Sequence, residues 1–355
     1  MVTGNESTPQ PERSDNMGRY VGVDLHKNMF VVSFYSADDH CHELKRYQMK
    51  EIAAFIEDLD NADTVAVEST NNTRYFVNCI REHVSEVKVI NPSQFKVIST
   101  SVKKTDENDA KVIAEFLSKD MVPEVRLKDK KTAQINSLAN TRDKLVKLRT
   151  ALKNKIHNIL SSHGILLKKE SLSSEKGLQG VLEQPVDPVA FVELDVIVSQ
   201  IRGLNEGIKR LDKELEDKGS ELPGHENITS IKGIGKKSGS ILLSVIGDIN
   251  DFENEKKLAA YFGIVPRVSN SNETERQGRI TKHGSKLGRT TLVQCTLIAI
   301  RYSPRLRAFY DRIKAKKGSG KAIIATAKKL LNIIYFTLKE NIVFEDFASG
   351  VIRTT

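Results

Sequence analysis

The chain has 355 residues, of which 39% are hydrophobic, so two domains are the first expectation, with one or three as alternatives. No apolar run approaches the ~20 residues that a membrane span needs, and the polar N-terminus lacks the apolar core of a secretory signal. We therefore expect a cytoplasmic protein without a membrane partner, in which residues 1–17 form a disordered tail. The three cysteines stand far apart, which argues against a C-x-x-C zinc module or a disulfide framework.

Positive charge is concentrated in two long blocks. The formal net charge is +9, but Arg126–Lys169 alone has twelve Lys or Arg against two Asp, and Arg276–Lys329 has fifteen against one. Such blocks create a positive field that attracts polyanions. A single short block is usually a solvated helix face, whereas two long blocks favour nucleic acid as a partner.

The first region has the pattern of an α/β domain. Short apolar or β-branched runs predict strands, and apolar residues at helical spacing predict helices. The predicted strands are Tyr20–Leu25, Met29–Tyr35, His42–Tyr47, Thr64–Val67 and Val87–Ile90, and the predicted helices are Ile52–Leu59, Arg74–His83 and Asp106–Lys119. Three strands, helix, strand, helix, strand, helix is an RNase-H-like order.

The middle of the chain carries a heptad repeat. Seven apolar residues alternate in steps of three and four: Leu194, Ile197, Ile201, Leu204, Ile208, Leu211 and Leu215. This spacing is typical of a coiled coil, and Leu145–Ile159 has similar steps. Ser171–Pro188 lies between the two and is interpreted as a reversal or a linker. The seam can pack within one chain as a helical hairpin or between chains, and both alternatives stay open.

The third region begins near Pro223 and is predicted to be mostly helical. Gly233 and Gly235 lie just before an apolar helix at Ile241–Ile246, as in a helix-hairpin-helix motif that grips a DNA backbone. The alternative is a plain connection between two helices. Two further helices are predicted at Leu287–Ile300 and Lys321–Leu338.

Four acidic residues are placed where a metal site would be built. Asp24 ends the first strand, Glu68 follows a buried strand, and Asp106 and Asp109 share one face at the start of a helix. Each alone is explained as a turn or helix-cap residue. Together they form the oxygen cluster that hard divalent cations prefer, and like charges at one point repel unless a cation is bound.

Three motifs resemble the DEDD transposases of insertion-sequence family 110. They are Val21–Lys27, Val67–Thr70 and Lys104–Ala110. Further matches in the C-terminal part follow in the family's order: Ile231–Gly235, Ala260–Arg267 and Gly278–Gly284. The resemblance covers nearly the whole chain after Met17. It implies a RuvC-like catalytic domain at 18–125, a helical coiled-coil region at 126–222 and a transposase domain at 223–355.

The resemblance also implies an activity. Members of the family move DNA elements or invert DNA segments with a divalent metal, Mg²⁺ or Mn²⁺, and a serine of the C-terminal domain. Insertion-sequence members are guided by a structured RNA that the element encodes. DNA, such an RNA, and other copies of the chain in a dimer or tetramer are therefore the expected partners.

The family's serine follows a Pro-Arg pair, and here Ser271 takes that position after Arg267. The family's next residue is glycine, which this sequence replaces with Asn272, so Ser269 is a second candidate. The residues expected to contact nucleic acid are Gly233, Gly235, Arg267, Arg276, Arg279, Lys282, Lys286 and Arg289.

Four hypotheses follow from the sequence. The first is an RNA-guided recombinase that uses Asp24, Glu68, Asp106, Asp109 and Ser271. The second is a protein-guided DNA invertase with the same chemistry. The third is a junction-resolving nuclease, which needs the acids but no serine. The fourth is a non-catalytic nucleic-acid-binding protein, in which the acids are dispensable.

Overall fold

A computed structural model describes residues 18–92, 95, 105–271, 274–345 and 353–354, with the backbone alone for 268–271, 274–277 and 353–354. The predicted N-terminal tail and Asn272 lie outside the described residues. The chain divides into two compact units, Met1–Leu127 and Lys128–Thr355, each described by itself below. The division into three domains stays a prediction. No helix in the described ranges combines the length and apolar character that crossing a membrane requires.

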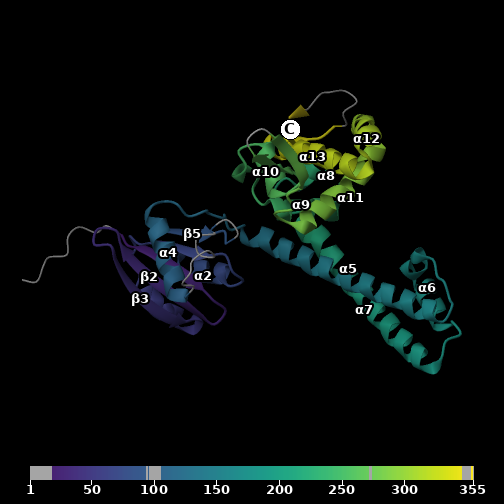
Figure 1. The fold of residues 1–355 in the computed structure, drawn as a ribbon, viewed down its shortest axis with the longest axis horizontal. Coiled ribbons are helices and arrows are strands. Elements are labelled where there is room, and N and C mark those ends of the chain that lie inside the picture. The colour runs from purple at the N-terminus through teal and green to yellow at the C-terminus, as the bar shows by residue number, and fades with distance from the viewer. Residues whose placement is uncertain (1–17, 93–94, 96–104, 272–273, 346–352, 355) are drawn as a thin grey trace, which may run out of the picture. The chain divides into compact units, whose positions relative to one another are not determined.

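The first unit is built on one mixed sheet of five strands (Figure 1). The strands are β1 (Tyr20–Leu25), β2 (Met29–Ser36), β3 (Cys41–Gln48), β4 (Thr64–Glu68) and β5 (Glu86–Ile90). Their order in the sheet is β3-β2-β1-β4-β5. β1, β2 and β3 pair antiparallel, whereas β4 runs parallel to both β1 and β5. The predicted α/β class is confirmed, and this arrangement is consistent with the predicted RNase-H-like domain.

Helices contribute to separate cores on the two faces of the sheet. The first core joins sheet residues to α1 (Ile52–Glu57) and α2 (Thr73–Ile80), with 3-10 turns at Met49–Glu51 and Arg81–His83. Phe30 lies at its centre, with Tyr47, Phe55 and Phe76 at 5.1 to 5.3 Å between ring centroids. The second core joins Ala66 and Ile90 to α4 (Asp106–Ser118). Because successive strand residues point to opposite faces, the even-numbered residues of β1 face α4.

The second unit begins with a long helical hairpin (Figure 1). α5 (Lys130–Ser162) and α7 (Pro188–Gly219) pack side by side, and a 3-10 turn at Lys169–Ser173 and α6 (Glu175–Leu182) lie between them in the chain. The heptad seam of α7 is largely buried, as Leu194, Ile201 and Leu215 are each 0% exposed. The seam therefore packs within one chain, which settles the alternative that the sequence left open.

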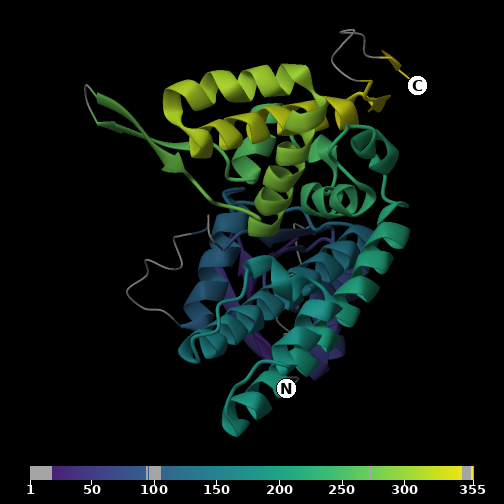
Figure 2. The same cartoon turned by 90° about the vertical axis from the view of Figure 1, so that its right-hand side faces the viewer.

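The rest of the second unit is a cluster of helices around one core. The helices are α8 (His225–Thr229), α9 (Lys236–Ile246), α10 (Glu255–Tyr261), α11 (Lys286–Tyr302), α12 (Pro304–Lys317) and α13 (Ser319–Lys339), and a 3-10 turn lies at Ile249–Asp251. Two strands, β6 (Pro266–Ser271) and β7 (Thr274–Ile280), form an antiparallel hairpin that extends away from the helices (Figure 2). β8 (Ile342–Val343) and β9 (Arg353–Thr354) form a second, minimal pair. The β6–β7 hairpin was not among the predicted elements.

Candidate functional site

The sheet brings Asp24 and Glu68 to one edge. β1 and β4 are parallel neighbours, and Val23 lies opposite Val67 in their register. The next residue of each strand is the acid, so both carboxylates leave the sheet at its carboxyl edge. Asp24 is 6% exposed and Glu68 is half-buried.

Helix α4 supplies the other two acids because it packs unusually close to β1. A Cβ on Gly22 would lie 2.2 Å from the backbone oxygen of Ala110, so only glycine permits this approach. The Thr105 side chain caps the helix by accepting a 3.2 Å hydrogen bond from the Asn108 backbone nitrogen. Asp106 and Asp109, in the first turn, are three residues apart and share a face.

The four acids share one electrostatic environment. Burial raises the pKa of the Asp24 carboxyl to about 6; the neighbouring His26 opposes this rise, while the negative charges of Asp106, Asp109 and Glu68 add to it. Asp109 is itself 7% exposed. The structure thus gathers the four acids that the sequence singled out.

His26 is a member of this cluster that the sequence analysis did not single out. Its Nε2 lies 3.2 Å from Oδ2 of Asp24 and 3.4 Å from Oδ1 of Asp106. Donor atoms of these three residues lie within 4.8 Å of one another, close enough to share a metal ion. The spacing Asp-x-His was the available signal, since residues two apart at a strand end point to the same side.

The backbone around the cluster is held by side chains of the β4–α2 connection. The Asn72 side-chain amide donates to the carbonyl oxygens of His26, at 3.2 Å, and Lys27, at 2.8 Å. Thr73 Oγ1 donates to the Glu68 carbonyl at 2.8 Å. These bonds fix both the turn that carries His26 and the end of β4.

The donor set fits a hard divalent cation. Carboxylate oxygens predominate, and these are the ligands that suit Mg²⁺ and Mn²⁺, with the His26 imidazole as the one softer donor. Two of the carboxylates are buried, where uncompensated charge is costly. A bound cation would offset the burial and the repulsion that together raise the pKa of Asp24.

The predicted serine region forms strand β6. Ser269 and Ser271 lie opposite Arg276 and Thr274 of β7. The predicted contact residue Arg276 therefore shares this hairpin with both serines. The side chains of these residues lie outside the described part of the chain.

The two glycines before α9 have different environments. Gly233 has φ +109°, and a Cβ there would lie 2.6 Å from the Ala299 backbone nitrogen of α11, so packing explains this glycine. Gly235 is exposed, begins α9, and has open space where a Cβ would lie. Of the two, Gly235 is therefore the better placed for a phosphate.

The remaining predicted contact residues surround the base of the β6–β7 hairpin. Arg267, Arg279, Lys282 and Lys286 are exposed. Arg289 is half-buried, and its Nη1 donates to the carbonyls of Phe262, His283 and Gly284 at 3.1 to 3.2 Å. Arg289 thus holds the turn before α11, which leaves phosphate contact to its other guanidinium nitrogens.

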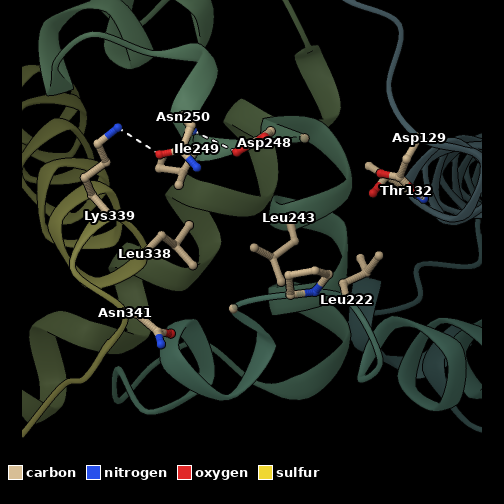
Figure 3. Close-up of a pocket in the computed structure, with 13 residues that line it drawn as sticks. Asp129, Thr132, Leu222, Leu243, Asp248, Ile249, Asn250, Leu338, Lys339 and Asn341 are labelled. Carbon is tan, nitrogen blue, oxygen red and sulfur yellow. Dashed lines mark hydrogen bonds between the residues drawn. The ribbon is translucent and has the colours of Figure 1, made fainter. Parts of the chain in front are cut away.

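A pocket of about 460 Å³ lies between α5, α9 and α13, away from all of these residues (Figure 3). Its two acids serve as helix caps: Asp129 accepts from the Thr132 backbone nitrogen and Asp248 from that of Asn250, each at 2.9 Å. Lys339 donates to the Asn250 side chain at 2.9 Å. The polar groups are engaged with one another, and we assign the pocket no role.

Comparison with known proteins agrees with this geometry. The family model of DEDD transposases of the IS110 type matches residues 21–165, which include all four acids. A second model, described as the transposase IS116/IS110/IS902 family, matches residues 225–311, which include β6 and α9. The chain belongs to the IS110 family of transposases.

Named relatives are matched over most of their length. The transposase for insertion sequence element IS1111A of Coxiella burnetii is 24% identical over 90% of this chain and 89% of its own. The transposase for IS1328 of Yersinia enterocolitica is 26% identical over 91% and 98%. The pilin gene-inverting protein of Moraxella bovis is 26% identical over 92% and 97%.

Membership in the family defines the type of enzyme. This transposase is a DNA-cleaving and DNA-rejoining enzyme, as the sequence predicted, and its substrate is DNA. A DEDD domain implies a divalent cation, and the Asp24–His26–Asp106 cluster is where the described residues offer ligands for one.

Proposed function

We propose that this transposase cuts and rejoins DNA with a divalent cation, Mg²⁺ or Mn²⁺, held by Asp24, Glu68, Asp106 and Asp109, and with Ser271 as nucleophile. The observation that carries the proposal is the cluster of Asp24, His26 and Asp106, whose donor atoms lie within 4.8 Å of one another beside the other two acids. A buried carboxylate with a strongly shifted pKa beside other ionisable groups is a candidate functional residue.

The bound cation would polarise the scissile phosphate and offset charge that develops on it. The protein's own part is to fix the ligands: the sheet register sets Asp24 beside Glu68, and the close packing permitted by Gly22 sets Asp106 and Asp109. Asn72 holds the backbone of His26, so this residue enters the site already oriented.

The serine distinguishes rejoining from hydrolysis. In the proposed step, Oγ of Ser271 loses its proton and bonds to phosphorus, while the cut strand leaves as an alcohol that takes up a proton. The phosphoserine ester keeps the bond energy, so the hydroxyl of a new strand can reverse the step. Water as nucleophile would discard that energy and leave only a nick.

A covalent protein–DNA adduct tests this proposal. We expect one on a nicked suicide substrate under denaturing conditions, lost in Ser271→Ala and retained in the control Ser269→Ala, with DNA binding intact in both. An adduct that persists in Ser271→Ala and vanishes in Ser269→Ala would move the nucleophile by two residues. Recombination by both variants without any adduct would refute the serine mechanism.

We further propose that the basic residues around the β6–β7 hairpin hold phosphates beside the serine, namely Arg267, Arg276, Arg279, Lys282, Lys286 and Arg289. Gly235 would contact a phosphate at the start of α9, and Gly233 would shape the turn before that helix. Arginine suits bidentate phosphate contacts. Replacing Arg279 and Lys282 with glutamine should weaken DNA binding and leave the unfolding temperature unchanged.

For the choice of DNA site, we propose guidance by a structured RNA that the element encodes. The similarity to the pilin gene-inverting protein favours a second candidate, a protein-guided invertase. Sequencing of nucleic acid that co-purifies with the protein separates them, because only the first predicts one discrete RNA.

We also propose a dimer or tetramer, to be measured by light scattering. Since α5 packs along the α7 seam, we place the contacts between copies elsewhere and expect Leu204→Glu to destabilise the hairpin more than the assembly. A junction-resolving nuclease would need the acids but not Ser271, and a non-catalytic binding protein would need neither. Loss of recombination in Ser271→Ala would exclude the nuclease, and loss of DNA cleavage on replacement of one of the four acids would exclude the non-catalytic protein.

A further inference from the structure

We propose that one face of the α12–α13 helix pair, carrying Arg312, Lys316 and Lys329, binds the phosphate backbone of duplex DNA. This surface, the α12–α13 basic face, is distinct from the contact residues near the β6–β7 hairpin. The inference rests only on DNA being the substrate, and not on the metal or on Ser271.

The charge of α12 is almost entirely of one sign. Its fourteen residues include six Lys or Arg and one acid, Asp311, which is 3.1 Å from Arg307. Within the part of the chain that the structure describes, Arg312, Lys314, Lys316 and Lys317 form no ion pair, and all four are exposed. Lys314, Lys316 and Lys317 lie in the last turn, where cations favour the helix dipole. Arg312 lies before that turn and repels Lys316, which is four residues further on, so the dipole does not account for the whole set.

On α5, the other basic helix of this unit, several cations form ion pairs that hold the fold together. On α5, Lys131 pairs with Glu221 at 2.6 Å and Lys155 with Glu193 at 2.7 Å. Arg142 and Lys147 are likewise paired with Asp212 and Asp143. Four cations of α5 are thus paired with acids of the same unit, whereas Arg312, Lys314, Lys316 and Lys317 of α12 have no such pair among the described residues.

Aromatic rings join the cations of α12 and α13 into one face. The Phe309 ring lies 5.4 Å from the Arg312 guanidinium carbon and 4.7 Å from Nζ of Lys329. Lys316 follows Arg312 by four residues and so lies one turn along the same face. Cation–π contacts hold long side chains without neutralising their charge, which leaves the cations pre-positioned for an anion.

The phosphate backbone of a duplex fits this face better than base edges do. A duplex carries one charge per about 1.7 Å of its axis, so neighbouring cations all find partners at once. α12 contains no Asn or Gln, the side chains that read adenine, and its Arg and Lys side chains can meet phosphates of any sequence. We therefore expect binding that is independent of DNA sequence and that positions the duplex.

Matched triple variants test the proposal on the full-length protein. Arg312→Gln, Lys316→Gln and Lys329→Gln are combined in one variant, and Lys131→Gln, Lys147→Gln and Lys155→Gln in the control. Each loses three positive charges, from the α12–α13 basic face or from ion-paired α5 positions. Fluorescence anisotropy measures the Kd for a short duplex of arbitrary sequence over a salt series, in EDTA so that cleavage does not contribute. Circular dichroism checks folding.

We expect the α12–α13 variant to raise the Kd about tenfold or more at physiological salt and the control to raise it less than about threefold. The slope of log K against log salt should fall by about 0.9 for each lost contact, or up to about 2.7. Equal losses in both variants would reduce the effect to total charge and overturn the proposal. Unchanged duplex binding, or weakened binding confined to a structured RNA hairpin, would overturn it as well.

A second variant separates positioning from charge. Phe309→Leu keeps an apolar side chain but removes the ring beneath Arg312 and Lys329. We expect a smaller rise in Kd, about twofold to fivefold, with an unchanged salt slope. A salt slope that falls as in the triple variant would contradict the role of the ring.

Discussion

The pKa values of two carboxylates, one in each unit of this transposase, are shifted in opposite directions. In the sheet unit, Asp24 is buried among other acids, and its pKa is raised to about 6. In the helical hairpin, burial alone would raise the pKa of Asp212, but hydrogen bonds from Arg142 and Lys237 lower it below the ordinary value of 3.8. In the sheet unit, burial and neighbouring acids raise the pKa of a carboxylate, whereas in the hairpin neighbouring cations lower that of another.

This difference distinguishes acids that stabilise the fold from acids that we propose bind a cation. A carboxylate that stabilises the native state is paired there, because burial of an unpaired charge is costly. Acids that lie close together favour a bound cation, because their like charges repel. The two environments therefore predict different responses to removal of a charge.

The largest effect is expected in the sheet unit. Asp109→Asn should lower DNA cleavage by at least about 10³-fold, because the site loses a cation ligand and several kcal/mol of charge stabilisation with it. Nucleic-acid binding should be spared. In EDTA the circular dichroism spectrum of the variant should match that of the wild type, which would show that the lost activity is not a loss of folding.

Added Mg²⁺ or Mn²⁺ provides the control for this variant. Cation binding to the native state should raise the unfolding temperature of the wild type and much less that of Asp109→Asn. Cleavage at the wild-type rate in saturating Mg²⁺ would remove Asp109 from the site.

The sheet unit was largely predictable from its sequence. Its strands are short and apolar, Glu68 directly follows the buried part of β4, and Asp24 lies near the end of β1, so register alone brings the two acids together. His26 was overlooked because its partner Asp106 is distant in sequence. A parallel case is Arg289, whose three carbonyl partners become neighbours only when the chain folds.

The second unit was less predictable, for two physical reasons. A heptad stripe specifies that α7 needs a partner but not which helix provides it, and α5 proved to be that partner. The β6–β7 hairpin is polar on both strands, so it has no apolar alternation from which a strand is normally predicted.

The second largest effect concerns the packing that brings the acids together. Gly22→Ala should destabilise the protein by about 2–3 kcal/mol, because its Cβ would overlap the backbone of α4 and push this helix from β1. Urea denaturation measures the loss. The control is Gly203→Ala in α7, where a Cβ meets nothing within 4 Å, and this change should stabilise by about 0.5–1 kcal/mol. Equal effects of the two changes would show that α4 does not depend on Gly22.

A smaller loss is expected at the paired acid of the hairpin. Asp212→Asn removes the charge between Arg142 and Lys237 and should cost about 1–2 kcal/mol of stability at neutral pH. The pKa of Asp212 is lowered in the folded state, so its contribution is present above 3.8 and is lost as the pH falls through that lower value. Wild type and variant should therefore converge in stability in acid. A constant difference down to strongly acidic pH would mean that the carboxylate charge is not what stabilises the hairpin.

The smallest effect tests whether pairing alone, without burial, stabilises the hairpin. Lys147 pairs with Asp143 one turn before it on α5, and the Lys147 side chain is 56% exposed, against 23% for the Arg142 side chain. Water screens the exposed pair, and ordering two long side chains offsets much of the attraction, so Lys147→Gln should change stability by less than about 0.5 kcal/mol. A double-mutant cycle of Lys147→Gln with Asp143→Asn isolates the coupling, and the same cycle at Arg142 and Asp212 provides the comparison. We expect the second coupling energy to be at least twice the first. Equal couplings would mean that burial contributes nothing to these pairs, and the contrast between the hairpin and the sheet unit would then reflect charge count alone.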